Sequence, residues 1–131
     1  MPATDHALEL AVGAARAAAD RKAEEIIGLD VSERLVLTDV FLIASGTNER
    51  QVVAIAEAVE EAMHARGVKA LRREGVREGR WALMDFGDLV VHVQHSEDRT
   101  YYALERLWSD CPVVDLPEDV TTDGNRPEAA S

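Results

Sequence analysis

The sequence is short of cysteine, of long apolar runs and of positive charge, and each shortage excludes a class of protein. Its single cysteine, Cys111, cannot form an internal disulfide, which fits a reducing compartment. No stretch approaches the roughly 18 apolar residues of a membrane-spanning helix. Lysine and arginine number 14 against 25 aspartates and glutamates, giving a net charge of −11. Such a chain repels phosphate backbones and attracts basic protein surfaces, so we expect little direct contact with nucleic acid.

The amino-terminal residues also lack the features of a targeting segment. Asp5 and Glu9 lie among the first ten residues, whereas signal peptides begin with basic residues and transit peptides avoid acids. We therefore expect a cytoplasmic protein that makes no contact with a membrane.

The remaining composition is that of one globular domain. The 131 residues are 47% hydrophobic and 30% charged, which is enough apolar material for a core. After Pro112 the apolar content falls and acidic residues accumulate, so we expect disorder there. We assign residues 1–116 to a folded domain and residues 117–131 to a disordered acidic tail.

The hydrophobic pattern predicts an α/β fold with a mixed β-sheet flanked by helices. Asn48 and Gln51 resemble a capping box, and Gly67 supplies the stop of the same helix. The continuous apolar run at 39–45 predicts a strand buried on both faces. Helices are expected at residues 4–20, at 48–67 and from 96 onward, and strands at 24–31, 39–45, 68–74, 81–86 and 89–94.

The last helix is predicted to have one apolar face. Ser96 is its expected cap. Apolar residues recur behind it at helical spacing, and we expect them to face the core: Tyr101, Leu104, and Leu107 or Trp108.

A hairpin with Gly87-Asp88 as its turn is the most informative stretch of the sequence. This register pairs apolar residues on one face, which we assign to the core: Phe86 with Leu89, Met84 with Val91, and Ala82 with Val93. The opposite face carries Trp81, Leu83, Asp85, Val90, His92 and Gln94. An aromatic anchor among a few polar groups is typical of an interface. A helix covering this face would instead make Trp81 part of the core, and the pattern leaves both interpretations open.

Two pairs of residues could be metal ligands, and their spacing argues against both. Asp85 and Asp88 could hold Mg²⁺, but Asp88 lies in the turn while Asp85 points away from one face of the strand. His92 and His95 are three residues apart on a strand, which places them on opposite faces.

Two further stretches are polar or basic. The turn at residues 45–48 leads from a buried strand into a helix, as any α/β protein requires, and leaves Thr47, Asn48 and Arg50 exposed for a possible partner. Residues 66–80 hold six of the 14 basic residues. We interpret this second stretch as a solvated edge strand in preference to a partner contact.

The hairpin and its surroundings resemble the ribosomal silencing factor (iojap-like) family. The resemblance is carried by residues 81–92, followed by Arg99, Tyr102 and residues 104–108, and upstream by residues 29–31, 39–47 and 50–52. It extends from about Thr4 to Leu116, with many specific residues in the right order. Gln94 and the acidic tail match no pattern of the family.

The resemblance implies a fold related to nucleotidyltransferases but without their catalytic acids, and a function that needs no cofactor. It implies binding to the large ribosomal subunit through ribosomal protein L fourteen, which would block joining of the small subunit and repress translation. A homodimer of the free protein is also plausible. The alternative is a nucleotidyltransferase-like enzyme. We expect partner contacts, and no catalytic or metal-binding residues, at Trp81, Asp85, Asp88, His92, Thr47 and Arg50.

Overall fold

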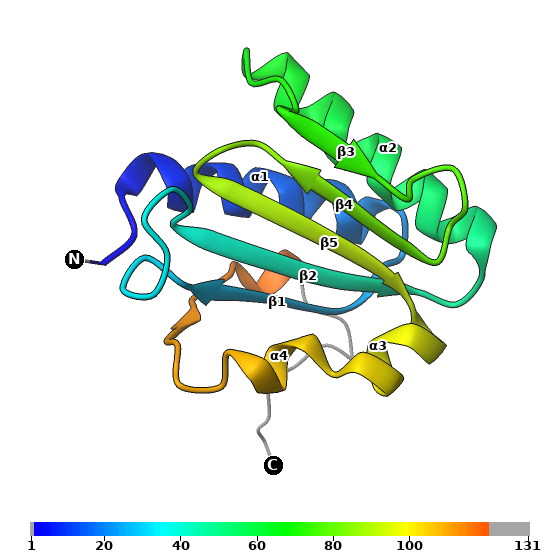
Figure 1. The fold of residues 1–131 in the computed structure, drawn as a ribbon. Helices are drawn as coiled ribbons and strands as arrows, with labels where there is room; N and C mark the ends of the chain where they lie inside the picture. The colour runs from blue at the N-terminus through cyan, green and yellow to red at the C-terminus, as the bar shows by residue number, and fades with distance from the viewer. Residues whose placement is uncertain (1, 121–131) are drawn as a thin grey trace.

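The computed structural model describes residues 2–120, which fold around one mixed sheet (Figure 1). The six strands lie in the order β3-β4-β5-β2-β1-β6, with β2 and β5 parallel and the other neighbours antiparallel. The strands are β1 Glu24–Asp30, β2 Val40–Gly46, β3 Arg72–Glu74, β4 Trp81–Asp85, β5 Leu89–His95 and β6 Val113–Val114. The helices are α1 Asp5–Asp20, α2 Glu49–Ala65, α3 Ser96–Tyr102 and α4 Leu104–Leu107, followed by the short 3₁₀ helix η1 Glu118–Val120. The predicted α/β fold with a mixed sheet is confirmed.

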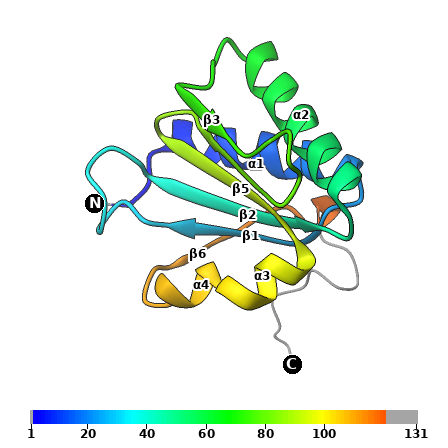
Figure 2. The same cartoon turned by 45° about the vertical axis from the view of Figure 1, so that its right-hand side comes forward.

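The helices cover the two faces of the sheet unequally. The long helices α1 and α2 lie across one face, and the short helices α3 and α4 lie below the other (Figures 1 and 2). Each pair encloses its own cluster of buried apolar side chains, one containing Leu42 and Val91 and the other containing Phe41 and Val90. Because β2 lies between both clusters, all seven of its residues are buried, as the apolar run predicted.

Local sequence signals define both ends of α2. The Asn48 side chain accepts a hydrogen bond from the Gln51 backbone N–H at 2.8 Å, which is one half of the predicted capping box. The Gln51 side chain does not return to Asn48 but accepts from the Thr47 backbone N–H at 2.7 Å. At the other end Gly67 has φ +81°, and the N–H groups of Gly67 and Val68 bond the carbonyls of His64 and Met63. This is a Schellman motif, so the predicted stop at Gly67 is confirmed.

The predicted strand at 68–74 is shorter than expected. Only Arg72–Glu74 pairs with the sheet, as β3, and all three residues are exposed at its edge. The predicted edge position is therefore correct, and the charged side chains protect this edge from pairing with other chains.

The predicted last helix is two short helices, because Ala103 takes the left-handed conformation with φ +48°. The cap is His95 and not Ser96, since the His95 side chain accepts from the Glu97 backbone N–H at 3.1 Å. The break also changes which residues face the core. Leu104 is buried as predicted, and of the alternatives Leu107 and Trp108 it is Trp108 that is partly buried. Tyr101, which was expected to face inward, is exposed.

Ordered structure continues beyond Pro112, contrary to the expected disorder. The two residues of β6 pair with Gly28 and Leu29 of β1. The side chain of Val120 is fully buried, and Arg16 of α1 forms an ion pair with Asp119 at 3.0 Å. The rest of the predicted acidic tail, residues 121–131, lies outside the described residues. Between residues 2 and 120, no helix combines the length and the apolar character that crossing a bilayer demands.

Candidate partner-binding surface

The β4–β5 hairpin has the register predicted from its sequence. Trp81 lies opposite Gln94, Leu83 opposite His92 and Asp85 opposite Val90. The Phe86 N–H donates to the Leu89 carbonyl at 2.8 Å, and Gly87 has φ +92°, which glycine adopts without strain. The six apolar residues assigned to the inner face all belong to the cluster beneath α1 and α2.

The opposite face of the hairpin is partly covered. His92 and Gln94 are buried, whereas Trp81, Leu83 and Asp85 keep part of their surface exposed. The sequence left open whether this face is an interface or part of the core. His92 and Gln94 belong to the core, whereas the other three side chains remain accessible to a partner. Trp81 and Leu83 lie on the same face of β4, and the half-exposed Tyr102 lies against the Trp81 ring; we call these three residues the Trp81 surface.

Trp81 is held in place on two sides. Its indole Nε1–H donates to Nδ1 of His92 at 3.1 Å, and its ring lies 5.0 Å from the ring of Tyr102. A tryptophan fixed in this way loses little conformational freedom when a partner covers it.

His92 supports Trp81 from inside the protein. It is only 6% exposed, and burial lowers the pKa of its imidazole to about 4, so the ring is neutral at physiological pH. Because Nδ1 accepts the bond from Trp81, the ring proton is on Nε2. In this position His92 orients Trp81 and does not itself reach the surface.

The buried polar groups beneath α3 are incompletely satisfied. Nε2 of His92 and both side-chain amide atoms of Gln94 have no hydrogen-bond partner within residues 2–120. An unsatisfied buried polar group costs about 1–3 kcal/mol. These three atoms therefore offset part of the free energy gained by burying the apolar side chains around them.

Asp85 and Asp88 do not form a paired acidic site. The Asp85 carboxylate accepts from the Gly87 backbone N–H at 2.8 Å and so stabilises the turn, while Asp88 is exposed at the hairpin tip. His95 caps α3, whereas His92 bonds Trp81. Across residues 2–120, no three His, Cys, Asp or Glu side chains are grouped closely enough to hold a metal ion.

Thr47 and Arg50 lie at the start of α2, at the end of the sheet away from Asp88. Both are exposed. The Thr47 hydroxyl donates to the Gln51 side chain at 3.0 Å, and the Gln51 amide donates to the carbonyls of Arg21 and Lys22 after α1, both at 3.0 Å. The structure thus brings Trp81 and His92 together but distributes the six predicted contacts over three places: the Trp81 surface, the hairpin tip and the start of α2.

Arg80 is a structural residue that sequence reasoning missed. Its guanidinium reaches Asp98 at 2.8 Å, Glu97 at 3.2 Å and Glu49 at 3.3 Å, joining the starts of α2 and α3 next to Trp81. Hydrogen bonds to Asp98 and Glu97 raise the pKa of Arg80 above its ordinary value. The preceding Gly79 has φ +73°, and a Cβ there would lie 2.6 Å from the Glu49 carbonyl oxygen. The only sequence signal was the concentration of basic residues at 66–80, which did not indicate a clamp between helices.

A protein-family model matches nearly the whole chain. The family described as "Ribosomal silencing factor during starvation" matches residues 4–131. A relative from Bacillus subtilis named "Ribosomal silencing factor RsfS" is 44% identical over 103 residues, which cover 79% of this chain and 87% of that protein. A maize relative, "Protein Iojap, chloroplastic", is 30% identical over 112 residues, and the chain spans about half of its length, 49%.

Two solved structures have the same fold. A crystal structure of a protein from Chromobacterium violaceum superimposes with a TM-score of 0.75 at 39% identity, covering 77% of this chain and 84% of that one. A crystal structure of a protein from Bacillus halodurans superimposes with a TM-score of 0.72 at 41% identity, covering 86% of this chain and all of that one, 100%.

Proposed function

From the premise that the chain belongs to the ribosomal silencing factor family, we propose that it binds the large ribosomal subunit through ribosomal protein L fourteen. Bound there, it prevents the small subunit from joining and so represses translation. The family assignment is the observation that carries this proposal, and the Trp81 surface is the place where we expect the principal contact.

The construction of the Trp81 surface supports this role. Tryptophan and tyrosine contribute much of the binding energy at many protein interfaces, because they are large and lose few rotamers on binding. Here the Trp81 ring is already oriented by His92 and Tyr102. Of the other sequence-predicted contacts, Asp85 and Asp88 present negative charge at the far end of β4, and Thr47 and Arg50 are proposed as secondary contacts.

The overall charge also suits the proposed partner. Proteins that bind ribosomal RNA carry basic surfaces to neutralise phosphates. A chain with a net charge of −11 is attracted to such a protein and repelled by exposed RNA. A protein of this charge seated on the large subunit would oppose the small subunit both sterically and electrostatically.

Co-sedimentation with purified large subunits, followed by a subunit-joining assay, tests the proposal. Trp81→Ala is expected to weaken binding by about 2 kcal/mol, roughly 30-fold, and to restore joining. Val113→Ser changes an exposed apolar residue on β6 and is the control, expected to bind like the parent. Circular dichroism at the assay temperature must show that both variants are folded. A folded Trp81→Ala variant that still blocks joining like the parent would place the contact elsewhere.

We also propose that the protein has no nucleotidyl transfer activity. This rests on the separation of Asp85, which bonds the turn, from Asp88, which points into solvent. Incubation with labelled nucleoside triphosphates and Mg²⁺ or Mn²⁺ is expected to give no transfer and no hydrolysis. Turnover that disappears in Asp85→Asn or Asp88→Asn would contradict the proposal. Dimerisation of the free protein is a further proposal, which light scattering on the gel-filtered protein tests.

A further inference from the structure

Three solvent-exposed aliphatic side chains lie at the end of the sheet opposite the start of α2. Val36 is 96% exposed, Leu37 84% and Leu71 74%. Single exposed apolar residues are common on soluble proteins, but three that gather at one end of the molecule are typical of an interaction site. We call these three residues the end patch.

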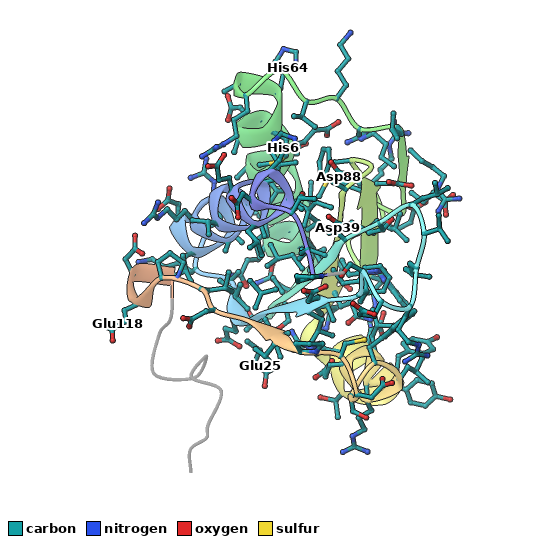
Figure 3. All side chains as sticks on the ribbon, turned by 90° about the vertical axis from the view of Figure 1, so that its left-hand side faces the viewer. His6, Glu25, Asp39, His64, Asp88 and Glu118 are labelled. Atoms are coloured by element: carbon teal, nitrogen blue, oxygen red, sulfur yellow. The ribbon has the colours of Figure 1, made fainter. Side chains whose placement is uncertain are left out.

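Backbone hydrogen bonds tie the two segments that carry the end patch to the hairpin tip. The Leu71 N–H donates to the Asp85 carbonyl at 2.7 Å, and the Asp39 N–H donates to the Asp88 carbonyl at 3.0 Å. The side chain of Leu71 also lies against Gly87, where a Cβ would be 3.7 Å from it. Figure 1 shows the loop at residues 32–39 beside this tip, and Figure 3, viewed from this end, labels Asp39 and Asp88 close together.

The charges around the end patch indicate what can bind there. Three carboxylates, those of Asp39, Asp85 and Asp88, form no ion pair with a basic side chain in the described part of the chain. Asp39 and Asp85 accept only from backbone N–H groups, those of Thr4 and Gly87.

Two basic residues flank Leu71 on the same side of the tip, but they do not cancel these carboxylates. Arg72 lies opposite Asp85 in the β3–β4 register, and its guanidinium reaches Glu74 at 3.6 Å. Lys69 and Arg72 therefore stand against four carboxylates, those of Glu74, Asp39, Asp85 and Asp88. The complementary surface is therefore basic and carries aliphatic side chains. A phosphate backbone would be repelled, and a second copy with its own charge of −11 fits poorly.

We propose that the end patch and its three aspartates form a second docking point for a basic protein segment that carries aliphatic side chains. It lies at the other end of β4 from Trp81, a separation of about 13 Å for four strand residues. The inference rests on the proposed function, since the segment belongs to the same large-subunit partner that contacts the Trp81 surface. Two contacts on one rigid sheet would fix the orientation of the protein on the subunit, which one aromatic anchor cannot do.

Matched surface variants separate this inference from the proposed function. The double variant Val36→Ser/Leu37→Ser removes exposed apolar surface, with Val113→Ser as its control. Asp88→Lys reverses a charge at the tip, with Asp20→Lys at the exposed end of α1 as its control. Each test variant is expected to bind purified large subunits about tenfold more weakly than the parent, and each control within about twofold. Asp88→Lys is also expected to flatten the salt dependence of the association rate.

The outcomes distinguish which idea fails. If the parent does not sediment with large subunits, the proposed function and the inference are both wrong. If the parent binds and Trp81→Ala does not, while both end variants bind like the parent, the inference and the proposed contact at Asp88 are overturned, and the contact through Trp81 stands. If the end variants change the mass found by light scattering but not ribosome binding, the patch is a contact between copies of this chain, which also overturns the inference.

Discussion

Acidification should destabilise this protein through one buried histidine. His92 has an ordinary pKa of 6.5 that burial lowers to about 4 in the folded state. Below pH 6.5 the unfolded chain binds a proton at this site that the folded chain excludes, so the free energy of unfolding must fall as the pH drops toward 4. Applying the linkage relation between about pH 7 and about pH 5 gives a loss of about 2 kcal/mol from this group alone.

Urea denaturation followed by tryptophan fluorescence at several pH values measures this effect. Carboxylates also contribute to the pH dependence, so the informative quantity is the difference between the parent and His92→Gln, which has no imidazole to protonate. The parent is expected to lose about 2 kcal/mol more than the variant between about pH 7 and about pH 5. Parallel stability curves for the two proteins would refute the reasoning. A separate check is the NMR titration of His92, whose imidazole signals should not shift until the pH approaches 4.

One further substitution and one truncation test the description of the core. Gln94→Met is expected to raise the free energy of unfolding by about 1–2 kcal/mol, because it removes buried amide atoms that lack partners; a comparable loss in urea denaturation would show that Gln94 is satisfied in solution. Deleting residues 117–131 is expected to lower stability by about 2 kcal/mol, since this removes the fully buried side chain of Val120. An unchanged denaturation midpoint would mean that Val120 does not pack on α1 in solution.

The elements predictable from the sequence are those whose signals are local. Asn48 and Gly67 define the ends of α2 because a cap and a left-handed stop act within a few residues of the chain. The register of the β4–β5 hairpin follows from a two-residue turn and a side-chain period of two. These features require no knowledge of the rest of the molecule, and the hairpin also carries Trp81, the principal residue of the candidate surface.

Other features were decided by contacts between distant parts of the chain. Tyr101 faces solvent because Arg99 takes the inward position of α3, where its guanidinium donates to the Ser45 hydroxyl of β2 at 3.5 Å. Ala103 then ends the helix in the left-handed conformation. Helical periodicity alone cannot predict such a break, since alanine normally favours continuation of a helix.

Which residues share a surface was likewise settled by the tertiary structure. The end patch exists because β3 and the loop at 32–39 both reach the tip of one hairpin, although Val36 and Leu71 are 35 positions apart in the chain. Residues 113–120 are ordered because β6 pairs with the free edge of β1 and Val120 packs against α1. Composition determined how much apolar material this protein has, and the order of the strands determined which of it remains exposed to a partner.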